Sequence, residues 1–77
     1  MKHKVINIDP EIMGGTPVFM GTRVPIQSLF DYLEGGETLD EFLDNFPTVK
    51  RKFAIEVLRI AEKLTTSKKV LDETFVG

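Results

Sequence analysis

The fold is decided by one stretch of the chain, Gly14-Gly15-Thr16-Pro17-Val18-Phe19-Met20-Gly21-Thr22-Arg23-Val24-Pro25. Its apolar run, Pro17 to Met20, has the composition of a short β segment, and a turn-rich connection links it to a second such segment at Val5 to Ile8. Pro25 suits the first turn of a helix, because a backbone N–H there would have no helical acceptor and its absence costs nothing. The stretch therefore predicts a β ribbon over residues 4–24 that carries Arg23 and runs directly into a helix.

Two further features place the first and second helices. Apolar residues with helical spacing follow Pro25 and stop at Gly35-Gly36. Thr38 and Glu41 then form a capping box, in which the threonine hydroxyl and the glutamate carboxylate each accept from the other residue's backbone N–H. A short second helix follows this box, and Pro47 stops it.

The third and longest helix is predicted from Thr48, as its N-cap, to about Leu64. One stripe of this helix is apolar, made up of Val49, Phe53, Val57, Ile60 and Leu64. Ile55 lies among the polar positions instead. The remaining residues, 65–77, mix polar and β-branched side chains, and we expect them to form a mobile tail.

A chain of 77 residues forms one small domain. We assign it to residues 1–64, with the ribbon at 4–24 and a three-helix bundle at 25–64, so the predicted fold class is mainly α. A core of this size is marginally stable alone, and the edge of a two-stranded ribbon is open to pairing. We therefore expect a homodimer.

The composition excludes several classes of protein. Cysteine is absent and His3 is the single histidine, so disulfide frameworks and zinc-ribbon spacings are ruled out. The chain has almost no residues from which a catalytic nucleophile and its base could be built. We therefore expect neither enzyme activity nor a cofactor or metal. No apolar run approaches the roughly 20 residues that a membrane span needs. We expect a cytoplasmic protein without membrane contact.

Charges are segregated along the chain. Residues 25–47 contain six carboxylates and no lysine or arginine, whereas residues 48–69 contain seven positive side chains against two negative ones. A basic segment of this kind is typical of a surface that faces a polyanion, although lysines on a solvated helix face give the same pattern.

The second and third predicted helices, joined at Phe46-Pro47, have the order of a helix-turn-helix, in which the later helix enters the major groove of DNA. The candidate contacts to double-stranded DNA are Thr48, Lys50, Arg51, Lys52, Ile55 and Arg59, together with Arg23 from the ribbon. Ile55 could touch a thymine methyl group. Two alternatives stay open: the helices could form an ordinary bundle with a basic third helix, and Arg23 could be a surface cation or pair with a helix carboxylate.

The tail carries four apolar residues that a short segment cannot bury against itself, namely Val70, Leu71, Phe75 and Val76. We expect them to bind a partner protein, with Phe75 as the main anchor. The alternative is that residues 70–76 pair with the ribbon of a second subunit and complete the dimer.

The chain resembles domain-of-unknown-function family 433 over about residues 6–64. The similar motifs are Ile8-Asp9-Pro10, Gly14-Gly15 with Pro17-Val18, Gly21-Thr22-Arg23-Val24-Pro25, Gly35-Gly36-Glu37-Thr38 and Phe46-Pro47. Proteins of this family look like VapB-type antitoxins, which are dimeric, bind DNA and are often encoded beside a small PIN-like ribonuclease toxin. The basic run Lys50-Arg51-Lys52 departs from the acidic helix start that members often show.

This resemblance implies an antitoxin-like protein that regulates its own operon and neutralises a PIN-like toxin through the tail residues. The alternatives are a protein–protein interaction module and a transcriptional regulator without a toxin partner.

Overall fold

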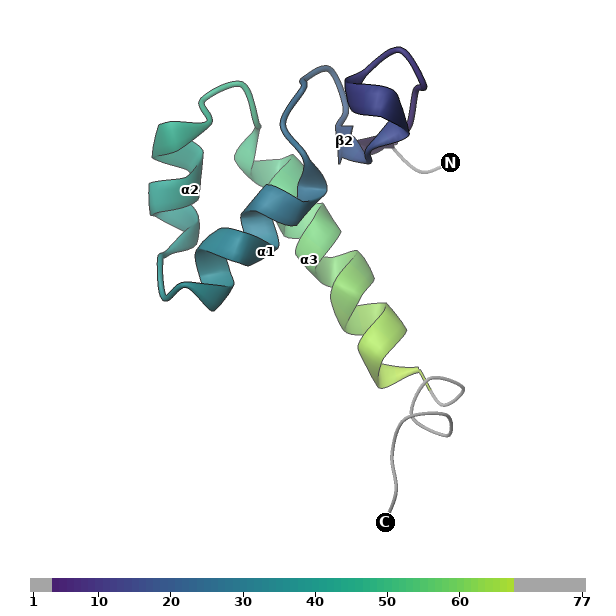
Figure 1. Ribbon diagram of the computed structural model, residues 1–77. Helices are drawn as coiled ribbons and strands as arrows, with labels where there is room; N and C mark the ends of the chain where they lie inside the picture. Colours follow the sequence, from purple (N-terminus) through teal and green to yellow (C-terminus); the bar gives the residue numbers. More distant parts are fainter. Residues whose placement is uncertain (1–3, 68–77) are drawn as a thin grey trace.

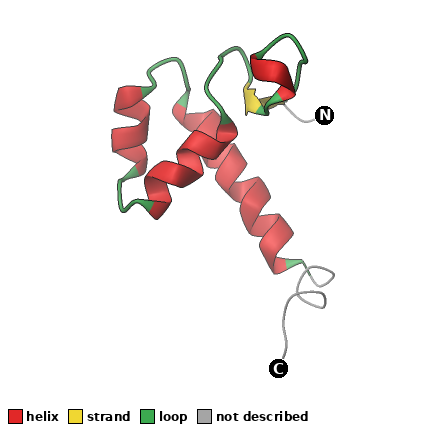
Figure 2. Ribbon diagram, viewed as in Figure 1, coloured by secondary structure: helices red, strands yellow, loops and turns green. Residues whose placement is uncertain are grey.

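The computed structural model describes residues 4–67, and Figure 1 shows the course of the chain. Its elements are β1 (Ile6–Asn7), the 3-10 turn η1 (Met13–Gly15), β2 (Val18–Phe19), α1 (Ile26–Glu34), α2 (Leu39–Asn45) and α3 (Arg51–Thr66). Helices dominate, and the strands form a small antiparallel pair near the N-terminus (Figure 2). The predicted fold class, mainly α with a short ribbon before three helices, is confirmed.

The ribbon is shorter than the sequence predicts. Ile6 pairs with Phe19 and Asn7 with Val18, and beyond them the N–H of Met20 donates to the carbonyl oxygen of Val5 at 2.9 Å. Asp9 ends the ribbon, because its carbonyl and carboxylate oxygens accept from the N–H groups of Ile12 and Glu11 and fold the chain into a turn. Ile8, expected in the strand, is instead 64% exposed.

Pro25 lies one residue before the first helix rather than within it. Its backbone is extended, with φ −64° and ψ 142°, and it forms a β-bridge with Val18. The N–H of Ile26 donates to the carbonyl oxygen of Pro17 at 2.9 Å. The start of α1 is thereby fixed to the ribbon.

The capping box at the start of α2 is confirmed. The Glu41 N–H donates to the Thr38 hydroxyl oxygen at 3.1 Å, and the Thr38 N–H donates to the Glu41 carboxylate at 2.7 Å. Two of the backbone N–H groups that no helical carbonyl can reach are satisfied in this way.

The prediction that Thr48 caps the third helix is wrong. The N-cap is Lys50, whose carbonyl oxygen accepts from the N–H groups of Phe53 and Ala54. Pro47 favours a turn, and the N–H of Val49 closes it by donating to the carbonyl oxygen of Phe46 at 3.0 Å. The helix also continues beyond Leu64, so the predicted boundary between domain and tail falls inside α3.

The core joins β1, β2 and the three helices. Its largest fully buried side chains are Phe19 from β2, Leu29 from α1 and Phe42 from α2, and α3 adds Ala54 and Val57. The apolar stripe predicted on α3 is therefore correct in its first half. Leu64, at the far end of the same stripe, is 60% exposed.

Candidate nucleic-acid interface and an adjoining pocket

The exposed face of α3 brings together three of the predicted DNA contacts. Lys52, Ile55 and Arg59 are exposed, while Ala54 and Val57 between them are buried. A helix turns about 100° per residue, so positions 52, 55 and 59 lie on the side opposite the core. Ile55 is 38% exposed, as its place among polar residues predicts.

Lys63 extends this basic face but is missing from the sequence-based site. It is exposed and lies one helical turn beyond Arg59. The four-residue spacing was a signal that could have found it, since residues i and i+4 share one helix face. We use the term basic face for Lys52, Ile55, Arg59 and Lys63.

Lys50 and Arg51 lie at the start of α3, where they are exposed but arranged differently. The guanidinium of Arg51 donates to the carboxylate of Asp40, in the first turn of α2. The side chains are 56% and 75% exposed, so water and salt screen the pair. Arg51 is therefore bound to an acidic group, unlike the members of the basic face.

The ammonium group of Lys52 contacts an aromatic ring in its own helix. It lies 5.8 Å from the centre of the Phe53 ring, within the range of a cation–π interaction. The ammonium group thus lies over a half-buried ring.

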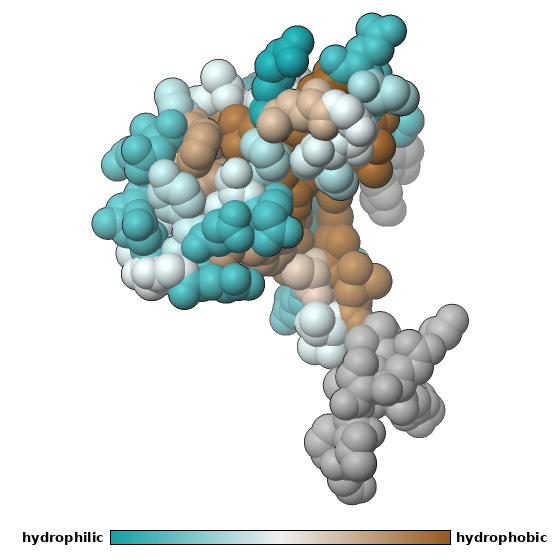
Figure 3. All heavy atoms as spheres, viewed as in Figure 1, coloured by the Kyte–Doolittle hydropathy of each residue, from teal (hydrophilic) through white to brown (hydrophobic). Residues whose placement is uncertain are grey.

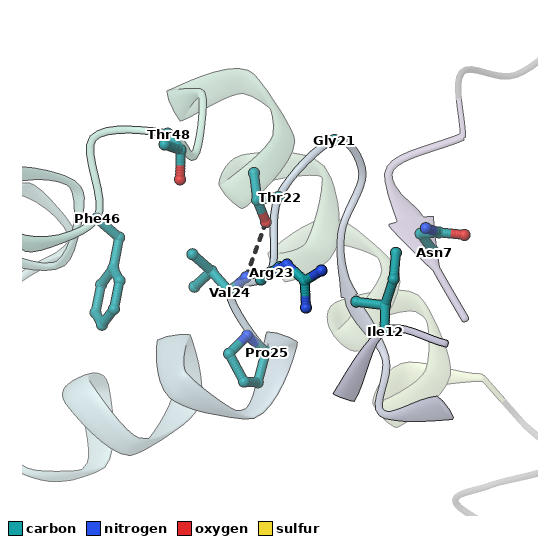
Figure 4. Close-up of a pocket in the computed structure, with 9 residues that line it drawn as sticks. All are labelled: Asn7, Ile12, Gly21, Thr22, Arg23, Val24, Pro25, Phe46 and Thr48. Carbon is teal, nitrogen blue, oxygen red and sulfur yellow. Dashed lines mark hydrogen bonds between the residues drawn. The ribbon is translucent and has the colours of Figure 1, made fainter. Parts of the chain in front are cut away.

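The two remaining predicted contacts, Arg23 and Thr48, line one pocket with a volume of about 610 Å³. Figure 4 shows Phe46 and Thr48 on one side of it and Ile12 on the other, with the loop at residues 21–25 between them. Residues more than twenty positions apart in the sequence thus share a site. No sequence pattern pointed to the part played by Ile12, because its turn has no regular period.

The candidate tail contacts Val70, Leu71, Phe75 and Val76 lie outside the described residues. Within residues 4–67, no group of three or more histidine, cysteine or carboxylate side chains could hold a metal ion. Every helix in that range also falls short of the length and apolarity needed to cross a membrane.

The fold and these two surfaces define a small three-helix domain with an N-terminal ribbon and a basic exposed helix. Residues 6–61 match the family model described as "Protein of unknown function (DUF433)", and the chain belongs to that family. The resemblance carried by the ribbon motifs is thereby confirmed at the level of the family.

One similar curated protein is the "Uncharacterized protein y4eO" of Sinorhizobium fredii, which is 33% identical over 46 residues. The match covers 60% of this chain and 21% of that protein, so the chain spans about a fifth of its relative's length. No solved structure matches the chain. Neither the family description nor the relative's name states a function.

Proposed function

We propose that this chain is a DNA-binding regulator that contacts double-stranded DNA through the basic face of α3. The observation that carries the proposal is the exposure of Lys52, Arg59 and Lys63 on one side of α3, three cations against the single carboxylate of Glu56, while Ala54 and Val57 on the other side are buried in the core. Cations held in a row on a rigid element fit a line of phosphates better than the same charges on a flexible chain.

The dimensions of α3 suit this role. From Lys52 to Lys63 the helix rises about 16 Å, at about 1.5 Å per residue, and a helix of ordinary diameter fits the major groove of B-DNA. Ile55 lies between the cations and has an apolar surface for a thymine methyl group. Lys50, just before the helix, adds a cation toward the same end.

The acidic α2 limits how DNA can approach. Asp40 is paired with Arg51, and Glu41 is engaged in the capping box. Both therefore have partners within the domain, which reduces their repulsion of a phosphate without removing it. The proposed contact is accordingly confined to α3 and the residues just before it.

The proposal includes a cytoplasmic homodimer. Two copies related by a twofold axis present two α3 helices to successive major grooves of a palindromic site. The small core and the exposed side chain of Ile8 support dimerisation, because a second chain would cover apolar surface that one chain leaves in water.

The proposal also includes the antitoxin role, which is supported by the resemblance of the ribbon motifs to antitoxin-like proteins. On this view the chain regulates its own operon, and residues 70–76 bind a PIN-like toxin. A regulator without a toxin partner would have the same α3 surface. The chain is proposed as a binding protein rather than an enzyme, and it uses no cofactor.

A second candidate function, a protein-interaction module, is favoured by the exposed apolar end of α3. Figure 3 shows apolar side chains along the part of this helix that extends beyond the body of the domain, and Leu64 is 60% exposed there. An interaction module needs this surface and has no use for the basic face. Binding to DNA therefore separates the two functions.

The test is fluorescence anisotropy with the DNA upstream of the gene and with an unrelated duplex, each across a series of salt concentrations. Binding should weaken as salt rises, and Arg59→Ala should reduce the slope by roughly one, because one phosphate no longer has a cation beside it. Lys4→Ala removes an exposed cation outside α3 and serves as the matched control. Equal effects of the two substitutions, or no binding by the parent protein, would reject the proposal.

A further inference from the structure

The pocket beside Arg23 combines an apolar lining with one cation. Its apolar side chains include Ile12, Val24, Pro25 and Phe46, and Thr48 contributes a hydroxyl group. Of the described residues that line it, Arg23 alone carries a charge. A volume of about 610 Å³ is within the range of ligand-binding pockets.

The loop that presents Arg23 is held firmly. The Thr22 hydroxyl donates to the carbonyl oxygen of Phe19 at 2.9 Å. It also accepts from the N–H of Val24 at 3.0 Å, the bond drawn as a dashed line in Figure 4. The Phe19 N–H in turn donates to the carbonyl oxygen of Val24 at 2.9 Å. Gly21 supplies the positive φ, 80°, that lets the chain turn this tightly. The backbone of Arg23 is thus fixed on both sides.

The guanidinium of Arg23 is nevertheless available. The side chain is exposed, and within residues 4–67 it has neither a hydrogen-bond nor an ion-pair partner. A guanidinium has five N–H donors in a planar fork that matches a carboxylate. A rigid loop thus holds a guanidinium, without a partner in the described part of the chain, beside an apolar pocket, which is the arrangement of a binding site.

The apolar lining decides between two kinds of ligand. A DNA phosphate needs donors around it and gains nothing from Val24, Pro25 and Phe46. A protein segment with a carboxylate close to a large apolar side chain uses both parts: the carboxylate accepts from Arg23, and the apolar side chain fills the pocket.

We propose that this pocket is a docking site for a segment of a partner protein in which a carboxylate lies close to a large apolar side chain. This inference goes beyond the proposed DNA binding and stands without it, because it involves no member of the basic face.

The test is an NMR titration of the ¹⁵N-labelled full chain with the peptide acetyl-Asp-Glu-Thr-Phe-Val-amide, which carries carboxylates close to a large apolar side chain. Amide signals of residues 12, 21–24, 46 and 48 should shift with saturation. A peptide with two lysines in place of the acids, and one with alanine in place of phenylalanine, should each bind about tenfold more weakly, because each lacks one half of the recognition.

Variants assign the site. Arg23→Gln keeps an exposed polar side chain and should lower the affinity for the acidic peptide about tenfold, whereas Arg59→Gln removes a cation of the basic face and should leave it unchanged. Equal binding of all three peptides, or equal effects of the two variants, would overturn the proposal. The DNA assay is a separate readout, so either proposal can fail alone.

Two other occupants would be seen in the same experiments. If a DNA duplex shifts the pocket signals and Arg23→Gln weakens DNA rather than the peptide, the pocket belongs to the nucleic-acid interface. The probe has the sequence of residues 72–76, so a second copy of the chain is the other occupant. In that case the pocket signals move on dilution without peptide. Either result would overturn the proposal that a partner protein occupies the pocket.

Discussion

Asp40 and Arg51 join the first turn of α2 to the first turn of α3 through a carboxylate–guanidinium pair on the surface. The pair places an acid beside Arg51, the first residue of α3, which is the helix proposed to contact DNA. The carboxylate of Asp40 therefore offsets part of the charge with which Arg51 could attract a phosphate.

This relationship gives the first prediction. Asp40→Asn should leave stability within about 1 kcal/mol of the parent, since exposed ion pairs contribute little. DNA affinity should rise by up to about fivefold, which corresponds to about 1 kcal/mol of binding free energy. The salt slope should steepen by roughly one, because Arg51 gains a phosphate contact. Anisotropy measurements across salt concentrations give both quantities.

The matched control is Asp44→Asn, which removes an exposed carboxylate from the same helix without releasing Arg51. If the two variants raise the affinity equally, the effect is one of total charge and the pair has no part in it.

A second prediction concerns the loop that presents Arg23. Thr22→Val keeps the shape of the side chain but removes both of its hydrogen bonds, to Phe19 and Val24. The free energy of unfolding should fall by about 1–3 kcal/mol, because the half-buried Val24 N–H is left without a partner, whereas the Phe19 carbonyl oxygen still accepts from the Thr22 N–H. Urea denaturation measures this change. Thr48→Val, at an exposed position, should change it by less than about 0.5 kcal/mol.

The capping box gives a third prediction. Thr38→Ala should cost about 1 kcal/mol in the free energy of unfolding, since the Glu41 N–H then has no acceptor. Glu41→Gln should retain most of the stability, because glutamine can accept from the Thr38 N–H in the same way. Thermal unfolding compares the two, and an equal loss of stability in both would mean that the charge of Glu41 matters more than its hydrogen bond.

The core gives a fourth prediction. Phe42→Ala should destabilise the domain by about 3–5 kcal/mol, enough to unfold much of the population of so small a protein. Leu64→Ala should cost less than about 0.5 kcal/mol, because that side chain already lies in water. Leu43→Ala should fall between them, since Leu43 is only partly buried. Circular dichroism during urea titration distinguishes the three, and a large effect at Leu64 would mean that another chain covers it.

The fifth prediction is the homodimer. Sedimentation equilibrium should give twice the monomer mass at micromolar concentration. Ile8→Asp and Leu64→Asp should each be tested for conversion to a monomer, because a buried carboxylate without a partner is costly at an interface. Disappearance of the dimer in one variant locates the interface. A monomeric parent protein would reject the dimer altogether.

Local features of the fold could be predicted from sequence. The capping box at Thr38 and Glu41 depends on two residues three positions apart, and the glycines that end α1 act on their immediate neighbours. Such features need no tertiary contact. The ribbon and the start of α3 were less predictable, because Asp9 and Pro47 each form a turn that competes with the regular structure beside it.

The candidate contacts on α3 could be predicted from the sequence, whereas the residues that share the pocket could not. Period alone places Ile55 and Arg59 on one face of α3. The meeting of Arg23 with Thr48 depends on how the ribbon packs against the turn before α3, and no local pattern determines that packing. The exposure of Leu64 could not be predicted either, because it depends on where the core ends. The apolar stripe on α3 continues past that point.

The aromatic packing around Phe42 gives the domain an intrinsic spectroscopic probe of its folding, the ring of Tyr32. Tyr32 of α1 lies edge-on to Phe42 and Phe46, with ring centres 5.5 and 5.7 Å away. The chain has one tyrosine and no tryptophan, so its near-ultraviolet absorption and its emission come chiefly from this ring. Separation of α1 from α2 can therefore be followed by light alone, without a label, during unfolding or on the binding of a partner.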